Sequence, residues 1–160
     1  MKQTNVVSHP LRITLVYNKK REDAGSTDDS NAEYDTPETI EAILTALRSN
    51  YEHVTALELD DELVENLKRE RPDIVFNIAE GLRGRGREAE VPALLNVLGI
   101  PYTGSDETAL AVSLDKQLCK RIASTYGIRT PESVTISSAD ETDGLSLRFP
   151  MIVKPNAEGS

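Results

Sequence analysis

Apolar positions along the chain follow two different spacings. Short apolar or β-branched runs predict four strands, at residues 12–17, 53–57, 73–77 and 100–103. Between these runs, apolar residues recur three and four positions apart, which is typical of amphipathic helices. The first such helix would carry its apolar stripe at Ile40, Ile43, Leu44 and Leu47.

Capping residues indicate where the helices begin and end. Thr36 followed by Pro37 predicts the start of the first helix. Asp60 or Asp61 is expected to cap a second helix, and Gly99 is expected to end a third. The second helix would carry Leu63, Val64 and Leu67, and the third Val91, Leu94, Leu95 and Leu98.

Strands that alternate with helices in this way predict a parallel sheet with right-handed crossovers. Residues 1–113 are therefore expected to form an open, Rossmann-like α/β domain. A second unit is expected at residues 114–160, beginning with a helix on Leu114, Leu118 and Ile122 that ends at Gly127. Two strands, at residues 131–136 and 149–153, would follow and leave an unpaired sheet edge.

Composition narrows the class of protein. The net charge of −9 argues against general nucleic-acid binding, which needs basic surface to neutralise phosphates. The single cysteine, Cys119, excludes an internal disulfide framework. No apolar stretch approaches the ~20 residues that a membrane-spanning helix needs, and residues 1–12 lack the apolar region that a secretory signal would be expected to have. We expect a soluble cytoplasmic protein with no membrane partner.

Several motifs with known chemistry are absent: the chain has no P-loop, no GxGxxG after the first strand, no CxxC pair and no HExxH. The two histidines, His9 and His53, lie at a terminus and at a strand start, where surface or structural roles are expected. A catalytic triad therefore has no basis in this sequence.

Candidate binding residues lie in the loops that leave the carboxyl ends of the strands, where open α/β sheets bind ligands. Glu33 and Glu80 could converge there and bind an amine or ammonium group; the alternative is two solvated loop charges. Three alternating arginines, Arg83, Arg85 and Arg87, could clamp a carboxylate or phosphate, or form a solvated charged face.

The end of the chain suggests phosphate binding. Lys154 follows a strand-like run, and residues 156–160 supply a turn whose backbone N–H groups could cradle a phosphate. Lys116, in the first turn of a predicted helix, has no distinguishing context of its own.

These segments together resemble the D-alanine–D-alanine ligases of the ATP-grasp superfamily. The matching text is DIVFN at 73–77, GIPYTGS at 99–105, DK at 115–116 and PMIVKPNAEGS at 150–160. Their order and spacing agree as well, so the resemblance covers most of the chain from Arg12. It implies a pre-ATP-grasp α/β domain over residues 1–113 and the start of an α+β ATP-grasp central domain over residues 114–160.

The resemblance also implies roles for individual residues. Lys116 and Lys154 match the lysines that contact ATP phosphates, and Glu33 matches the glutamate that receives the substrate ammonium. Ser160 matches the first serine of the catalytic loop beside substrate and phosphate. Glu80-Gly81 replaces a histidine-glycine pair of the substrate region, and Gly84-Arg85-Gly86-Arg87 replaces an acidic loop. These departures reverse local charge and indicate a divergent, ligase-like member.

The expected function is therefore that of the N-terminal part of an ATP-dependent carboxylate–amine ligase of peptidoglycan biosynthesis. Such a ligase activates a carboxylate as an acyl phosphate, and D-alanine is the leading amino-acid substrate. ATP and Mg²⁺ are expected in the complete, homodimeric parent, whereas this chain is expected to lack the metal site and to be inactive alone. The alternatives are a ligase for another amino acid or small acid, and a non-enzymatic α/β binding module.

Overall fold

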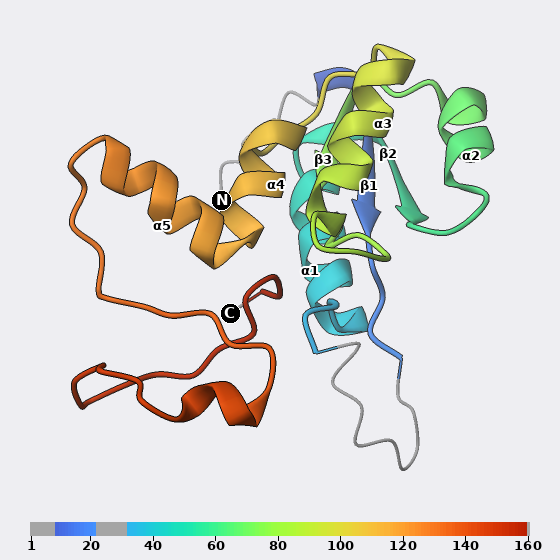
Figure 1. The fold of residues 1–160 in the computed structure, drawn as a ribbon. Helices are drawn as coiled ribbons and strands as arrows, with labels where there is room; N and C mark the ends of the chain where they lie inside the picture. The colour runs from blue at the N-terminus through green and yellow to red at the C-terminus, as the bar shows by residue number, and fades with distance from the viewer. Residues whose placement is uncertain (1–8, 22–31, 160) are drawn as a thin grey trace, which may run out of the picture.

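A computed structural model of the chain describes residues 9–21 and 32–159, and Figure 1 shows how their helices and strands are arranged. The elements are β1 (His9–Tyr17), α1 (Pro37–Arg48), β2 (Tyr51–Glu58), α2 (Leu63–Glu70), β3 (Ile74–Asn77), α3 (Glu90–Leu98), α4 (Glu107–Leu114) and α5 (Lys116–Thr125). Two short 3₁₀ helices, η2 (Arg87–Ala89) and η3 (Ala139–Thr142), complete the set. Among the described residues, no helix is both long and apolar enough to cross a bilayer.

Three parallel strands form the sheet in the order β2-β1-β3. They correspond to three of the four predicted strands, and their parallel pairing is the one predicted. Alternate residues of each strand face opposite sides of the sheet. Leu15 packs with Ile40 and Leu44 of α1 on one face. Its neighbour Val16 packs on the other face with Leu67 of α2. The result is a three-layer α/β/α arrangement, with α1 on one face and α2 and α3 on the other.

The predicted start of α1 is confirmed, and that of α2 is not. Thr36 is the N-cap of α1, and its side chain accepts a hydrogen bond from the Thr39 N–H. Glu62 occupies the N-cap position of α2 without a side-chain cap. Asp60 instead accepts a hydrogen bond from the Glu62 N–H at 2.9 Å, so it closes the turn before the helix.

The fourth predicted strand, residues 100–103, is reduced to an isolated parallel bridge between Val75 and Tyr102. Pro101 has no N–H to donate and therefore cannot extend a ladder. The next backbone donor on β3, the Asn77 N–H, bonds to the Thr103 hydroxyl at 3.1 Å instead of to a carbonyl. The segment still lies beside β3, so the four chain segments run in the predicted α/β order.

The helix expected across Leu114, Leu118 and Ile122 is two helices. Asp115 adopts an extended conformation between them, ends α4 and caps α5 by accepting a hydrogen bond from the Leu118 N–H at 2.8 Å. Helix α4 is not among the helices predicted from the sequence. Its sequence signal is the N-cap residue Asp106, whose carboxylate accepts a hydrogen bond from the Ala109 N–H. The predicted domain boundary at 113/114 lies beside this junction, and the division into two domains remains a prediction.

The two strands expected at residues 131–136 and 149–153 are absent, because both segments are irregular in the structure. Neither segment pairs with a described strand, and their apolar side chains lack a layer to pack against: Phe149 is 84% exposed and Val153 is 93% exposed. Apolar, β-branched composition favours a strand only where a neighbouring strand can take its backbone hydrogen bonds. The unpaired sheet edge predicted for this unit is therefore also wrong.

Candidate functional site

The strand order places a crevice at the carboxyl ends of β1 and β3. From β1 the chain moves to β2 on one side, and then crosses to β3 on the other side of β1. Open α/β sheets bind ligands where the connections diverge in this way. The loops that leave β1 and β3 at this point contain the predicted residues Glu33 and Glu80.

Asn18 joins these two loops. It directly follows β1, is 3% exposed, and its amide oxygen accepts hydrogen bonds from the N–H groups of Glu80 (2.8 Å) and Gly81 (3.2 Å). The Tyr34 hydroxyl donates to the Gly81 carbonyl at 3.1 Å. Gly81 has a φ of +85°, and a Cβ added there would overlap the Arg87 carbonyl. Gly81, predicted to bind substrate, therefore has a clear backbone role in folding this loop tightly.

A cavity of about 400 Å³ opens at this crevice. Its floor is partly apolar, formed by Ile43, Ile78 and Leu110 among others. Asp35, Glu80 and Glu88 bring three carboxyl groups to its wall, and none of the described residues that line it is a lysine, arginine or histidine. Because unpaired carboxylates are costly to bury, this wall favours a ligand that presents a positive charge beside a small apolar group.

The Glu80 carboxyl differs most from an ordinary glutamate. Burial raises its pKa to about 7, and the negative charges of Glu88, Glu33 and Asp35 act in the same direction, whereas Arg87 lowers it. Burial also raises the pKa of Glu88 and of Asp35. Glu80 therefore exchanges its proton near neutral pH, and a bound cation would favour its ionised form.

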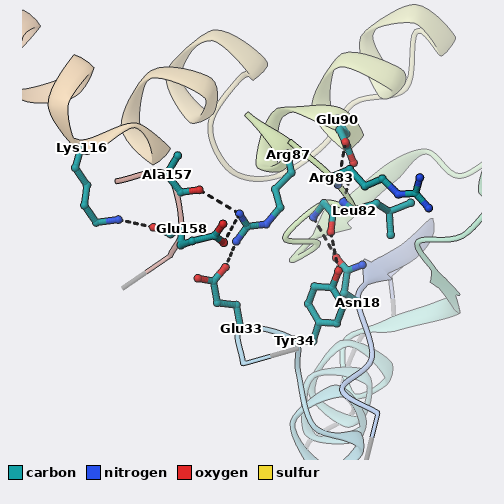
Figure 2. A network of polar contacts seen from close by, with 11 residues as sticks. Asn18, Glu33, Tyr34, Leu82, Arg83, Arg87, Glu90, Lys116, Ala157 and Glu158 are labelled. Atoms are coloured by element: carbon teal, nitrogen blue, oxygen red, sulfur yellow. Dashed lines mark hydrogen bonds and ion pairs between the residues drawn. The ribbon is translucent and has the colours of Figure 1, made fainter. Parts of the chain in front are cut away.

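Arg87 forms the centre of a polar network beside this cavity (Figure 2). Its guanidinium pairs with the Glu33 carboxylate and with the Glu158 carboxylate, the latter at 2.7 Å, and it also donates to the Ala157 carbonyl at 3.3 Å. The Arg87 side chain is only 10% exposed. Burial lowers its pKa, but the two carboxylates outweigh burial and raise it, so Arg87 remains charged.

The segment 156–159 is held beside the first turn of α5. Asn156 accepts hydrogen bonds from the Lys116 N–H at its carbonyl (2.9 Å) and from the Gln117 N–H at its side-chain oxygen (3.0 Å). Its amide nitrogen donates to Asp115 at 3.0 Å. The Lys116 ammonium donates to the Glu158 carbonyl (Figure 2). Residues about 40 positions apart in the sequence are thus joined through a helix N-terminus.

The structure brings together some of the predicted site residues and not others. Glu33, Glu80, Gly81 and Lys116 lie in or beside the crevice. Lys154 is exposed and makes no hydrogen bond or ion pair with residues 9–21 or 32–159. Ser160 lies outside the described residues, as does most of the loop before Ala32.

Other residues of the site were not identified from the sequence: Asn18, Asp35, Glu88 and Glu158. Asn18 and Asp35 do have a recognisable signal, because both sit where a regular element meets the loop at the carboxyl end of β1. Glu88 and Glu158 have no such signal. They reach the site only through the fold of their loops.

The three arginines have three different environments. Arg87 is buried in its ion pairs, and Arg85 pairs with Asp115 at 2.9 Å from an exposed position. The Arg83 side chain is exposed, forms no ion pair with any described residue and points away from the network in Figure 2. The described ranges hold no group of three or more His, Cys, Asp or Glu side chains placed to bind a metal ion.

Comparison with solved structures identifies the fold. The D-alanine–D-alanine ligase of Bacillus anthracis superposes with a TM-score of 0.63 and 24% identity, over 94% of this chain and 47% of that one. The Helicobacter pylori D-alanine–D-alanine ligase has a TM-score of 0.63 and 17% identity, over 94% of this chain and 54% of that one. The chain therefore has the fold of the corresponding part of these two structures.

Sequence comparison identifies the family to which the chain belongs. No family model matches the chain. The chain is 47% identical over 124 residues to the D-alanine–D-alanine ligase of Aquifex aeolicus, an alignment that covers 76% of this chain and 42% of that protein. It is 40% identical over 121 residues to the Pseudomonas entomophila D-alanine–D-alanine ligase, covering 74% and 37%. The chain therefore belongs to the D-alanine–D-alanine ligase family, and spans less than half the length of these curated relatives.

Proposed function

We propose that this chain forms the amino-acid-binding side of an ATP-dependent carboxylate–amine ligase, and that D-alanine is its substrate. The observation that carries the proposal is the cavity at the carboxyl ends of β1 and β3, with Asp35, Glu80 and Glu88 on its wall. Besides the carboxylate that a ligase would activate, D-alanine presents one ammonium group and one methyl group. The acidic wall and the apolar floor of the cavity suit these two groups respectively.

Glu33 is the residue that we propose binds the ammonium group directly. One of its carboxylate oxygens, Oε2, is taken by Arg87. The other, Oε1, lies against Gly159 and accepts no hydrogen bond from a described residue. A carboxylate held in this way keeps one oxygen available as a charge-assisted hydrogen-bond acceptor.

We propose that the described residues do not by themselves form a nucleotide site. Lys154 is exposed, the Lys116 ammonium is bonded to the Glu158 carbonyl, and residues 131–136 and 149–153 form no sheet that could enclose a nucleotide. ATP binding is supported by relatives of the same fold, one of which, from Bacillus anthracis, was solved in complex with ATP. We therefore propose that ATP and Mg²⁺ are used by this protein only with residues beyond those described.

Binding of D-alanine to the 160-residue chain tests the amino-acid site. Titration of ¹⁵N-labelled protein should shift the amide signals of Asp35, Glu80 and Gly81 in a saturable way, with smaller effects from L-alanine. Glu33→Gln should weaken binding at least about 10-fold, because a charge-assisted hydrogen bond is lost. Glu52→Gln, an exposed strand position, is the matched control and should change nothing.

The alternatives make different predictions in the same titration. A ligase for another substrate would respond to a different member of an amino-acid panel through the same amides. A non-enzymatic module would show no saturable response to any of them. Phosphate release from ATP, measured with D-alanine and Mg²⁺ beside the Aquifex aeolicus ligase as a positive control, should be absent for this chain.

A further inference from the structure

Three distant segments of the chain meet at one side chain. Glu33 belongs to the loop before α1, Arg87 begins η2 after β3, and Glu158 lies in the segment 156–159, which we call the terminal loop. Figure 2 shows the Arg87 guanidinium between the two carboxylates. Its NH2 group pairs with Glu33, while NH1 pairs with Glu158 and the Ala157 carbonyl.

The terminal loop approaches Glu33 very closely. A Cβ placed on Gly159 would come within 2.6 Å of the Glu33 carboxyl carbon. Any side chain at position 159 would therefore push the loop and the carboxylate apart. The absence of a side chain there and the fork of Arg87 act together to keep the Glu33 carboxylate against the terminal loop.

Charge explains why Arg87 is needed for this contact. Without a cation between them, the carboxylates of Glu33 and Glu158 would repel each other, and Glu80 and Glu88 add negative charge nearby. In the Arg87–Glu33 pair the two side chains are 10% and 23% exposed, whereas the Glu158 side chain in the other pair is 56% exposed. Solvent therefore screens the attraction between Arg87 and Glu33 less than that between Arg87 and Glu158.

We propose that Arg87 is a positioning residue of this site, which holds the terminal loop against Glu33 and so orients the free Glu33 oxygen. The proposal rests on the proposed function, in which Glu33 receives the substrate ammonium. Of the three alternating arginines, Arg87 alone is given this role, because Arg83 and Arg85 do not contact Glu33 or Glu158. It also gives a reason for the basic loop at 84–87, because Arg87 offsets carboxylates supplied by two other segments.

The test measures the terminal loop in the ligand-free chain, so that its result does not depend on whether D-alanine binds. Backbone ¹⁵N order parameters of Ala157, Glu158 and Gly159 should be about 0.85 in the wild-type chain. In Arg87→Gln they should fall below about 0.6, the range of a flexible segment. Arg83→Gln removes the same charge from an exposed neighbouring position and should leave them unchanged.

A charge exchange separates positioning from a general structural role. Arg87→Glu should loosen the loop as Arg87→Gln does. Adding Glu158→Arg should restore order, because one guanidinium again lies between two carboxylates. Arg87→Lys should restore part of it, since an ammonium lacks the planar fork. The Lys116 and Gln117 amides, which bond to Asn156, should stay protected throughout and show that the other anchor of the loop is intact.

A rigid terminal loop in folded Arg87→Gln, or a loop that stays flexible in the charge-exchanged double variant, would overturn the proposal. If the Arg87 variants do not fold, Glu158→Gln and Gly159→Ala decide it, because both change only the terminal loop. Each should loosen residues 157–159 while the β1 and β3 amides keep their protection. Unchanged order parameters in both would equally overturn the proposal.

Discussion

The sheet region and the segment from 126 to 155 have similar apolar residues and very different structures. In the sheet region, Leu15, Leu67 and Leu95 are fully buried between layers. In the later segment, Phe149, Ile152 and Val153 are each more than 80% exposed and form no strand. The difference shows that apolar sequence becomes regular structure only where a partner element covers it, since each strand needs both a hydrogen-bonding neighbour and a packed face.

The largest expected difference between the two regions is in core packing. Leu67→Ala removes a fully buried side chain between α2 and the sheet, and should lower the free energy of unfolding by about 2–5 kcal/mol. Val153→Ala, at a 93% exposed position, should change it by less than about 0.5 kcal/mol. Urea denaturation followed by circular dichroism measures both, and similar losses for the two variants would show that residues 126–155 are packed after all.

A smaller difference is expected between two glycines of the same loop. Gly81 and Gly84 both have a φ of +85°, but an added Cβ would overlap backbone only at Gly81, and would meet nothing within 4 Å at Gly84. Gly84→Ala should therefore cost about 1 kcal/mol of strain, and Gly81→Ala at least about 2 kcal/mol. Equal costs in urea denaturation would mean that the close approach of Gly81 to Arg87 does not hold the loop.

The smallest expected effect is a dependence on pH. The Glu80 pKa is raised to about 7, so the folded state binds a proton more tightly than the unfolded state. The contribution of Glu80 to stability is therefore present below pH about 4.5 and is lost as pH rises through about 7. Glu80→Gln should remove this loss, which we expect to be on the order of 1 kcal/mol after allowing for solvent screening.

Urea denaturation at pH 4.5 and pH 8 tests this prediction. The stability of Glu80→Gln relative to the wild-type chain should increase between the two pH values. Glu52→Gln, on the exposed side of β2, should show no such increase. The same relative stability at both pH values would place Glu80 in a more solvated setting than the cavity wall.

Local signals were enough for the sheet region. The strands at 12–17, 53–57 and 73–77 and the Thr36 cap are confirmed, because short apolar or β-branched runs and cap residues are local signals that the fold did not override. Local signals were not enough at Asp115, which splits one apolar stripe into two helices, or at residues 100–103, where Pro101 stops the ladder. In both cases a single residue outweighs the periodic pattern around it.

By itself, the sequence determined the parallel α/β class, the family, and which loops reach the carboxyl edge of the sheet. These follow from the order of strands, helices and motifs along the chain, which can be read without knowing the fold. Only the tertiary structure decided that Asp35, Glu80 and Glu88 share one cavity, and that Arg87, rather than Arg83 or Arg85, joins Glu33 to Glu158. The physical reason is that charge and burial act over a few ångströms. The strand order and the loop turns bring together segments that are as much as 125 positions apart in the sequence, as Glu33 and Glu158 are.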